Sequence, residues 1–414
     1  AVSAWMELSK KYGNLPFKEL FQPAIKYAKD GFLVSPITAD LWEKLKPIYN
    51  RNEFSDFTRI FYPEGRSLKA GELFKIPDLA KTLAIIAETD GQAFYHGELA
   101  KKISEYSNEQ GGLLRYQDLT SHKPKWENTI SLDYEDVTLH ELPPNGQGLA
   151  ALIALGILKN FNLDSYDPDS VEALHLQIEA MKLSFADTYR YVSDPETMDL
   201  SPSRLLNKSY LIKRAELIDL KSAQEYENGI PGYGDTVYLT TADEDGMMVS
   251  YIQSNYFGFG SGVMVPRTGI TLQNRGNCFS LKENHPNHVG PNKRPFHTII
   301  PAFVTQKNKP LMSFGVMGGS MQPQGHTQMM LRIFQYGQNP QTAIDAPRWR
   351  VGNRKQVSLE KGLDKKIIDQ LHEKGHKISI NHYSNFGGAQ IIYKLEDGYL
   401  AASEPRKDGQ AVGY

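Results

Sequence analysis

The sequence has few of the features that define several common classes of protein. It contains a single cysteine, Cys278, which excludes an internal disulfide framework and a cysteine-based zinc site. No run approaches the roughly 18 apolar residues that a membrane-spanning helix needs. The formal net charge is only −2, and scattered lysines and arginines form no basic surface for nucleic acid. We therefore predict neither a membrane nor a nucleic-acid partner for this globular chain of 414 residues.

Motifs for nucleotides and metals are also missing. The turn cluster at 143–148 precedes an apolar helix and could cradle an anion, but it lacks nucleotide-binding spacing, which favours a packing turn. His285 and His288 stand three apart around a proline, which prevents a helical ligand pair. The Pro-Arg-Trp run at 347–349 could clamp a ligand, although packing is commoner for such a pair. We predict no metal and no cofactor.

Strands and helices alternate along the chain, without an internal repeat. Apolar spacing in the first half predicts helices at 1–12, 17–32, 76–106 with a break near 91, 149–158 and 171–192, and a strand-like run at 130–142. In the second half it predicts strands at 263–272, 298–305, 310–315 and 357–360, helices at 321–336 and 365–373, and a closing hairpin at 389–402. This alternation suits a layered α/β architecture.

The stretch from 232 to 261 carries the strongest local signal. Two runs with a period of two flank the acidic turn at 243–246 and predict a β-hairpin whose first strand begins at Thr236. A loop at 225–234 precedes it, and the glycines within 258–262 would let the backbone approach a ligand closely. Taken alone, the pattern favours an ordinary hairpin between two loops.

The run from 235 to 274 resembles the start of the small subunit in the γ-glutamyltranspeptidase family of N-terminal nucleophile hydrolases. Further matches follow in order at 254–255, 259–262, 268–270, 290–295 and 318–320, and the resemblance covers nearly the whole chain. In that family a threonine that opens a strand is freed by self-cleavage. The matching residue is Thr236, with Asp235 on the other side of the scissile bond.

The resemblance implies a fold and a subunit organisation. The implied fold is α/β (α+β), a four-layer αββα sandwich with two antiparallel sheets between helical layers. A large-subunit part, 1–235, and a small-subunit part, 236–414, would pair after self-cleavage into one interleaved catalytic unit, and a homodimer is compatible with it. The family carries a further segment before its Pro-Ala-Ile motif, here at 23–25, which holds the arginine that grips the substrate's α-carboxylate. Localisation is left unknown, with a cytoplasmic location favoured over export.

Threonine suits this chemistry once it becomes an N-terminus. A free α-amino group has a pKa of about 7.7–8.0, so a useful fraction is neutral and can accept the hydroxyl proton. The resemblance assigns the oxyanion-binding N–H groups to Gly318 and Gly319 and places Asn255 near the nucleophile. A tight turn at the glycines and an asparagine that satisfies a backbone group are the structural alternatives.

Departures from the family pattern concern the substrate pocket. Cys278 stands where the family places an acidic residue for the substrate's α-amino group, and Arg275 replaces a neutral amide. His297 and Thr298 replace the serine pair that helps hold the α-carboxylate; Ser254 is also assigned to substrate binding. The connection 279–295 is short and lacks the family's lid loop. This pattern resembles the acylase-type branch, which includes cephalosporin and glutaryl acylases.

Two hypotheses of different class follow. The first is an amide-bond hydrolase or acyltransferase that acts on γ-glutamyl or other acidic, glutaryl-like acyl amides through an acyl-Thr236 ester. The second is a catalytically silent relative that serves as a binding or scaffold protein, motivated by the absent acidic partner at Cys278. Cleavage between Asp235 and Thr236 separates them, because only the first requires it.

Overall fold

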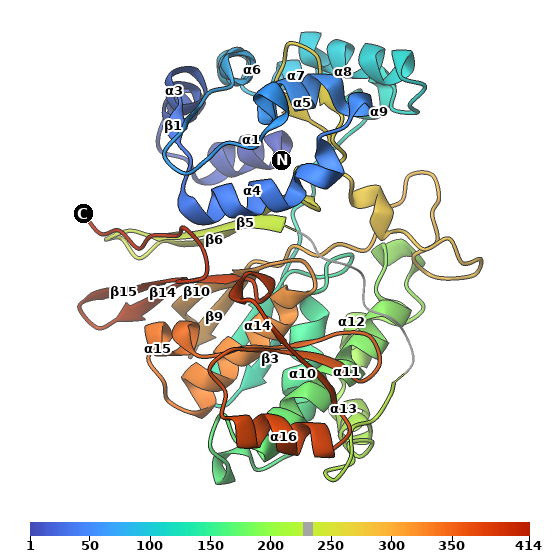
Figure 1. Ribbon diagram of the computed structural model, residues 1–414, viewed down its shortest axis with the longest axis vertical. Coiled ribbons are helices and arrows are strands. Elements are labelled where there is room, and N and C mark those ends of the chain that lie inside the picture. The colour runs from blue at the N-terminus through green and yellow to red at the C-terminus, as the bar shows by residue number, and fades with distance from the viewer. Residues whose placement is uncertain (227–234) are drawn as a thin grey trace. The chain divides into compact units, whose positions relative to one another are not determined.

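The structure is a computed structural model that describes residues 1–226 and 235–414 (Figure 1). Two compact units are present: unit 1 comprises 1–126 and 258–274, and unit 2 comprises 127–257 and 275–414. Among the helices described, none has the length and apolar character that crossing a membrane requires. Most of the predicted loop at 225–234 lies outside the described residues. The predicted subunit boundary at 235/236 is a cleavage site and does not coincide with the boundary between these two units. It stays a prediction.

Unit 1 is mainly helical. Its elements are α1 (Val2–Tyr12), α2 (Phe17–Leu20), α3 (Gln22–Asp30), β1 (Phe32–Leu33), α4 (Pro36–Tyr49), η1 (Asn52–Phe54), α5 (Ser55–Phe61), η2 (Pro63–Gly65), β2 (Leu73–Phe74), α6 (Pro77–Glu88), α7 (Gln92–His96), α8 (Glu98–Glu109), α9 (Tyr116–Thr120), β7 (Met264–Val265) and β8 (Ile270–Thr271). The single helix expected at 17–32 is wrong, because Pro23 lies in the first turn of a new helix, where proline is tolerated. The single strand expected at 263–272 is also wrong, since a turn with Gly269 at φ +67° separates β7 from β8.

The glycine-rich stretch 258–262 packs against aromatic side chains of unit 1. The Tyr49 hydroxyl donates to the Gly260 carbonyl at 2.8 Å, and a Cβ on Gly258 would lie 2.9 Å from that hydroxyl oxygen. The Phe259 ring lies 4.9 Å from that of Phe61 and 5.3 Å from that of Phe57. Gly258 and Gly262 therefore leave room for aromatic rings, and the approach to a ligand stays a prediction.

Unit 2 contains the larger sheet. Its elements are β3 (Ile130–Tyr134), β4 (Val137–Glu141), α10 (Gly148–Leu158), η3 (Leu163–Ser165), α11 (Val171–Tyr191), η4 (Pro195–Thr197), α12 (Pro202–Leu205), α13 (Lys208–Ala215), β5 (Asp235–Ala242), β6 (Met248–Tyr256), η5 (Arg275–Cys278), β9 (Ala302–Gln306), β10 (Lys309–Met317), α14 (Met321–Met330), the π-helix η6 (Leu331–Gln335), α15 (Pro340–Asp345), β11 (Trp349–Val351), β12 (Gln356–Glu360), α16 (Lys365–Glu373), β13 (Lys377–Asn381), η7 (Tyr383–Asn385), β14 (Gly388–Leu395) and β15 (Gly398–Ser403).

Six antiparallel strands form this sheet, in the order β15-β14-β10-β9-β4-β3. The run expected as one strand at 130–142 is a hairpin that turns at Glu135, with φ +51°. The strand expected at 298–305 begins only at Ala302, and the closing hairpin is confirmed. A separate three-stranded sheet, β11-β12-β13, includes one parallel pair, β12 with β13.

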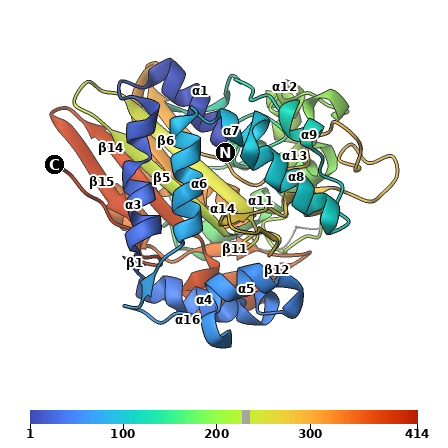
Figure 2. The same cartoon turned by 90° about the horizontal axis from the view of Figure 1, so that it is seen from above.

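Alternation along β10 separates two layers that cover the sheet. Phe314 and Val316 point toward α14, where Val316 fills the space beside Gly325. Ser313 and Gly315 point to the other face, where the β5–β6 hairpin packs (Figure 1). Viewed from above, the hairpin and the β14–β15 pair are neighbouring ribbons (Figure 2). Unit 2 thus stacks helices, a sheet and an antiparallel hairpin, which are layers that the resemblance implied.

Candidate functional site

A β-bulge sets the surroundings of Thr236. Asp235 pairs with Tyr256 and Val237 pairs with Gln253, so Thr236 alone lies opposite two residues of β6, Ser254 and Asn255. Such bulges re-aim side chains and are common beside active sites. The structure thereby brings the predicted nucleophile next to the predicted Asn255. The roles of both remain predictions.

The strand β5 packs on β10, the strand that leads into the predicted oxyanion turn. The Thr240 hydroxyl forms a hydrogen bond with Ser313, and two residues earlier the Tyr238 ring covers Gly315, where any Cβ would collide with it. The two strands therefore run past each other in steps of two residues. If the same step continues, we expect Thr236 to lie near Met317, the residue immediately before Gly318 and Gly319.

The Thr236 hydroxyl is both buried and unpartnered. The residue is 8% exposed, and its Oγ1 has no hydrogen-bond partner in the residues that the structure covers. A buried hydroxyl without a partner costs free energy, so native proteins rarely keep one without a reason. An oxygen that none of the described protein groups engages is available to a reacting group.

The turn between β10 and α14 has a backbone that favours glycine. Gly318 has φ +127° and Gly319 has φ +60°, both in the region that side chains disfavour. A Cβ on Gly318 would lie 3.1 Å from the Cα of Gly387. The turn leads directly into α14, whose amino-terminal N–H groups and dipole favour negative charge nearby. This geometry fits both the predicted oxyanion role and the plain turn.

Gln147 links this turn to the segment around Thr298 through hydrogen bonds. The sequence did not predict this role. Its side chain is fully buried, and its Nε2 donates to the carbonyl of Gly319 at 2.8 Å and to that of Thr298 at 2.6 Å. Its only sequence signal is its place in the 143–148 cluster. That cluster is a packing turn as expected, since a Cβ on Gly148 would lie 2.7 Å from the Cβ of Glu141.

Arg275 brings the predicted substrate-binding residues together. Its Nη1 donates to Thr298 Oγ1 at 3.1 Å, and its Nη2 donates to the Ser254 carbonyl at 3.4 Å. The guanidinium carbon lies 5.4 Å from the centroid of the Tyr256 ring, within cation–π range. The residue is 8% exposed, and burial lowers the pKa of its guanidinium. Ser254 also closes a local turn, because its Oγ accepts from the Tyr256 N–H at 2.8 Å.

His297 is held by its backbone and carries a neutral ring. Its N–H donates to the Asn145 carbonyl at 2.9 Å, and its carbonyl accepts from the Gln147 N–H at 3.0 Å. Burial and the positive charge of Arg275 lower the pKa of the ring to about 3. A neutral imidazole can donate one hydrogen bond and accept another, but it adds no positive charge for a substrate carboxylate.

We expect this histidine to make the protein lose stability in acid. The unfolded ring has a pKa of about 6.5, so below that pH the unfolded chain takes up a proton that the folded ring refuses until about pH 3. The free energy of unfolding should therefore fall as pH drops from 6.5 toward 3, by at most about 1.4 kcal/mol per pH unit from His297. Urea unfolding at pH 7, 6, 5 and 4 measures it. The His297→Asn variant should show a shallower slope; an unchanged slope would refute the assignment.

Tyr189 and Arg350 join the site without a signal in the sequence. The Tyr189 hydroxyl is buried without a hydrogen-bond partner among the described residues, and burial raises its pKa well above its usual value. It interacts electrostatically with Arg350, Tyr256 and Cys278. Arg350 donates to Ser320 Oγ at 3.4 Å, directly after the glycine turn. The sequence predicts an apolar helix around Tyr189, and in such a helix a tyrosine of the site has the same pattern as a tyrosine of the hydrophobic core.

Cys278 is partly buried beside the Tyr256 hydroxyl. Burial raises the pKa of its thiol, which the Tyr256 hydrogen bond and Arg275 only partly offset. A neutral thiol therefore occupies the place where the resemblance led us to look for a carboxylate.

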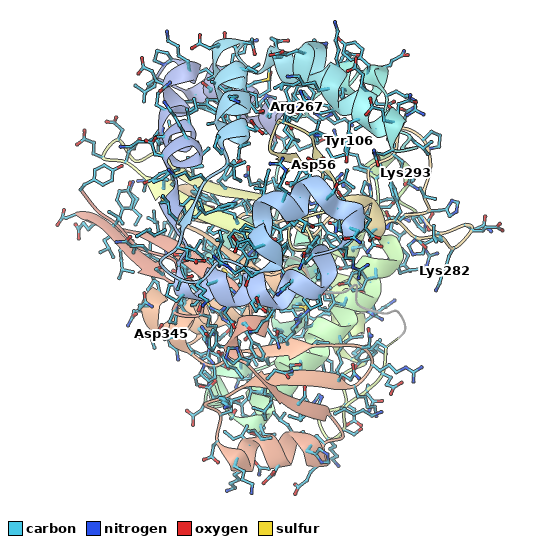
Figure 3. All side chains as sticks on the ribbon, turned by 45° about the horizontal axis from the view of Figure 1, so that its top comes forward. Asp56, Tyr106, Arg267, Lys282, Lys293 and Asp345 are labelled. Carbon is cyan, nitrogen blue, oxygen red and sulfur yellow. The ribbon has the colours of Figure 1, made fainter. Side chains whose placement is uncertain are left out.

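The connection 279–295 is folded back onto the site. Asn287 Nδ2 donates to the Cys278 carbonyl at 2.7 Å, and its Oδ1 accepts from the Phe296 N–H at 2.8 Å. Lys282 and Lys293, labelled in Figure 3, belong to this connection. His285 is one of the two histidines that were weighed as metal ligands. Its Nε2 contacts the Tyr189 carbonyl at 3.2 Å, and its Nδ1 accepts from the Asn287 N–H at 3.0 Å. One ring nitrogen therefore bonds within the connection and the other bonds to α11.

The Pro-Arg-Trp run at 347–349 is packing, as expected. Arg348 is fully buried, with Nη2 donating to Glu404 Oε2 at 2.7 Å and Nη1 donating to the Phe386 carbonyl at 2.9 Å. The Trp349 indole N–H donates to Gln177 Oε1 at 3.0 Å. The arginine is therefore occupied by buried protein groups and is not a ligand clamp.

Comparison with known proteins gives a consistent family. The family model described as gamma-glutamyltranspeptidase matches residues 1–414. The chain is 36% identical to the glutathione hydrolase-like YwrD proenzyme of Bacillus subtilis (strain 168), covering 100% of this chain and 79% of that protein. It is 33% identical to the oxamate amidohydrolase proenzyme of Klebsiella pneumoniae, covering 100% and 80%.

A solved structure agrees with this assignment. The cephalosporin acylase from Bacillus halodurans is 46% identical and superposes with a TM-score of 0.95, covering 100% of this chain and 77% of that one. The predicted fold class, mixed helices and antiparallel sheets of the N-terminal nucleophile hydrolase type, is confirmed. The similarity to an acylase also agrees with the predicted acylase-like branch.

Proposed function

The chain is an enzyme of the γ-glutamyltranspeptidase family, and on this premise we propose that it cleaves amides of acidic acyl groups through an ester on Thr236. One observation carries the proposal: the hydroxyl of Thr236 is buried, has no hydrogen-bond partner among the described residues, and belongs to a bulge opposite Ser254 and Asn255. Few structural roles account for a hydroxyl left in that condition. The names of its relatives, which include hydrolases and an acylase, support amide cleavage as the reaction class.

Maturation and turnover use the same oxygen. Thr236 Oγ1 first attacks the Asp235 carbonyl carbon, its proton passes to the Thr236 nitrogen, the Asp235–Thr236 C–N bond breaks, and an ester replaces the amide. Water then hydrolyses the ester, which leaves a carboxylate on Asp235 and a free α-amino group on Thr236. In turnover this amine takes the proton from Oγ1 as the oxygen bonds to the substrate carbonyl. The proton passes to the departing amine, and water later opens the acyl ester.

The glycine turn is proposed to hold the charge that develops. Each tetrahedral intermediate places a negative oxygen on the former carbonyl. N–H groups of Gly318 and Gly319, at the amino end of α14, are suited to receive it. Gln147 keeps the turn in place through the Gly319 carbonyl. Asn255 is proposed to stay near the nucleophile and orient it.

Acidic acyl groups are the proposed substrates. Arg275 provides a buried positive charge between Thr298 and Ser254, and Arg350 provides another beside Ser320. The neutral thiol of Cys278 offers nothing that would attract a substrate ammonium group. An acyl chain with a terminal carboxylate and no amine therefore fits the charges of Arg275 and Arg350 better than a γ-glutamyl group does.

Mass spectrometry of the full-length protein tests the proposal. The expected result is two fragments, the smaller beginning at Thr236, and an added acyl mass on that residue when a slow glutaryl ester is quenched in acid during turnover. An acyl group found on another residue would refute the threonine mechanism. A chain that stays intact and hydrolyses no amide would instead favour the binding or scaffold role.

We expect glutaryl amides to be cleaved as well as, or better than, γ-glutamyl amides. A hydrogen bond to a charged group contributes roughly 1.5–3 kcal/mol, or one to two decades, and Cys278 cannot make one with an ammonium. Matched glutaryl and γ-glutamyl anilides, compared by kcat/KM with and without a dipeptide acceptor, provide the measurement. The short 279–295 connection should favour hydrolysis over transfer.

Two variants at one position sharpen this comparison. Cys278→Asp should raise kcat/KM for the γ-glutamyl anilide by one to two decades and lower it for the glutaryl anilide. Cys278→Asn, similar in size but uncharged, should leave the ratio near that of the parent. A parent enzyme that prefers γ-glutamyl and transfers efficiently would mean that other residues recognise the amine.

A further inference from the structure

The helix α14, labelled in Figure 1, is buried along its whole length although half of its side chains are polar. The buried polar residues are Gln322, Gln324, His326, Thr327 and Gln328. A buried polar group costs free energy unless it has a hydrogen-bond partner. Most of the partners here are backbone groups of neighbouring segments, so the helix does more than fill the core.

The pairing of β9 with β10 ends before β10 does. Its last pair is Ala302 with Phe314, and one further antiparallel step would pair Ile300 with Val316. Val316 still pairs with Ala389 of β14 on its other side, but Ile300 lies outside the sheet. The two chains therefore diverge at this point. We call the two diverging segments the fork: 298–301 and 315–319.

Two side chains of α14 supply the hydrogen bonds that the missing strand pair would have made. The Ile300 N–H donates to Gln322 Oε1 at 3.0 Å, and the Val316 N–H donates to His326 Nε2 at 3.2 Å. Gln322 and His326 are four residues apart, so both lie on one face of the helix. Gly325 allows the helix to come close, because a Cβ there would lie 2.5 Å from Val316 Cγ1. The helix therefore sets the separation at which the fork begins.

His326 can accept this hydrogen bond because Glu141 fixes its tautomer. The Val316 N–H can only donate, so His326 Nε2 carries a lone pair and the ring proton lies on Nδ1. That Nδ1 lies 2.6 Å from Oε1 of Glu141, the last residue of β4. Both side chains are fully buried. The start of the fork is therefore held by α14 and by β4 together.

A second link spans the fork near the oxyanion turn. Gln147 Nε2 donates to the carbonyl of Thr298 and to that of Gly319, one residue on each segment. Gln147 Oε1 and Gln322 Nε2, the other amide atoms of the two glutamines, are buried without a partner among the described residues. An apolar side chain would avoid that cost, so packing alone does not explain why amides lie here.

The two segments of the fork carry different parts of the proposed site. One ends in the glycine turn, where Gly318 and Gly319 are the proposed oxyanion donors. The other begins with Thr298, whose Oγ1 accepts from Arg275 Nη1 at 3.1 Å. The reacting carbonyl of an acyl group would lie at the first and its terminal carboxylate at the second. The number of methylene groups between them must then match the separation of the two segments.

We propose that the fork selects the length of the acyl chain, because its links keep Arg275 at a set separation from the oxyanion turn. The positioning residues are Gln147, Gln322 and His326. This inference rests on the proposed function. A difference of one methylene is commonly discriminated by about ten-fold or more. The parent enzyme should therefore favour glutaryl over succinyl and adipyl anilides by about that factor.

The test compares kcat/KM of the mature full-length enzyme for succinyl, glutaryl and adipyl anilides. Gln147→Met keeps the length of the side chain but removes the donor between two carbonyl oxygens, which then repel each other and open the fork. We expect the adipyl-to-glutaryl ratio to rise about ten-fold. Gln322→Met removes the acceptor for the Ile300 N–H and should raise the ratio too, which keeps the test decisive if the first variant folds poorly.

A matched control separates acyl selection from a general loss of stability. The ratio of two substrates on one sample does not depend on the fraction of enzyme that is folded. Gln177 of α11 is 4% exposed, and its Oε1 accepts from the Trp349 indole N–H at 3.0 Å. Gln177→Met therefore also leaves a buried N–H without its acceptor, but outside the fork. It should lower the Tm and keep the parent ratio.

The possible contrary results have different meanings. A parent with similar kcat/KM for all three lengths would overturn the fork as a selector of length. Parent ratios in both fork variants, or an equal change in Gln177→Met, would also overturn it, and would favour a carboxylate held by Arg350 beside Ser320. A parent that cleaves none of the three amides would contradict the proposed function itself, and the fork with it.

Discussion

Replacing Thr236 with alanine is expected to abolish cleavage and turnover together, the largest effect of any single substitution in this chain. The hydroxyl is the one atom that both reactions require, and it has no protein hydrogen bond whose loss would disturb the fold within the described residues. Activity should fall to background, and the chain should remain a single band on a denaturing gel. Thr236→Ser, which keeps the oxygen, should retain both reactions at reduced rates.

A second threonine of the same strand provides the control. Thr241 lies exposed near the far end of β5, so Thr241→Ala should cleave and turn over like the parent. Thermal unfolding should show that both alanine variants remain folded. Turnover by a Thr236→Ala chain at more than background would show that another group is the nucleophile.

The hairpin around Thr236 was predictable because its alternation with a period of two is local. The bulge that sets Thr236 opposite Ser254 and Asn255 was not, because a bulge depends on how two strands pair across a turn. The role of a glycine was also hard to predict, because it too depends on which distant residues lie beside it. At 318–319 it marks a left-handed turn, whereas at 258–262 it leaves space for aromatic rings. A glycine in the sequence indicates a left-handed turn or a close contact, but it does not indicate which group lies against it.

Residues that reach the site from distant segments left no readable pattern. Gln147 contacts Gly319 across 172 positions, and Tyr189 belongs to a helix whose neighbours are mostly core. The burial of Glu179 and Lys182 on α11 could not be predicted, because charged residues on a helix normally face water. Lys182 and Glu179 are instead buried as a pair, and their partners come from the 219–226 segment and from His376. Such networks follow from tertiary packing, which local spacing cannot encode.

Replacing Gly319 with valine is expected to lower kcat by about 10²–10³-fold, the usual consequence of losing one oxyanion donor. At φ +60° a β-branched residue cannot keep the backbone of this turn, so its N–H groups would move from the reacting carbonyl. KM should change much less, because Arg275 and Thr298 lie outside the turn.

Gly337 offers a matched comparison for this effect. It has φ +62°, almost the same backbone strain, and nothing lies within 4 Å of where its Cβ would be. Gly337→Val should therefore lose stability without losing kcat, whereas Gly319→Val should lose kcat with its secondary structure intact. Circular dichroism, thermal unfolding and steady-state kinetics on both variants separate strain from catalysis. If the two lost kcat equally, backbone strain alone would account for the result, and Gly319 would be only a turn.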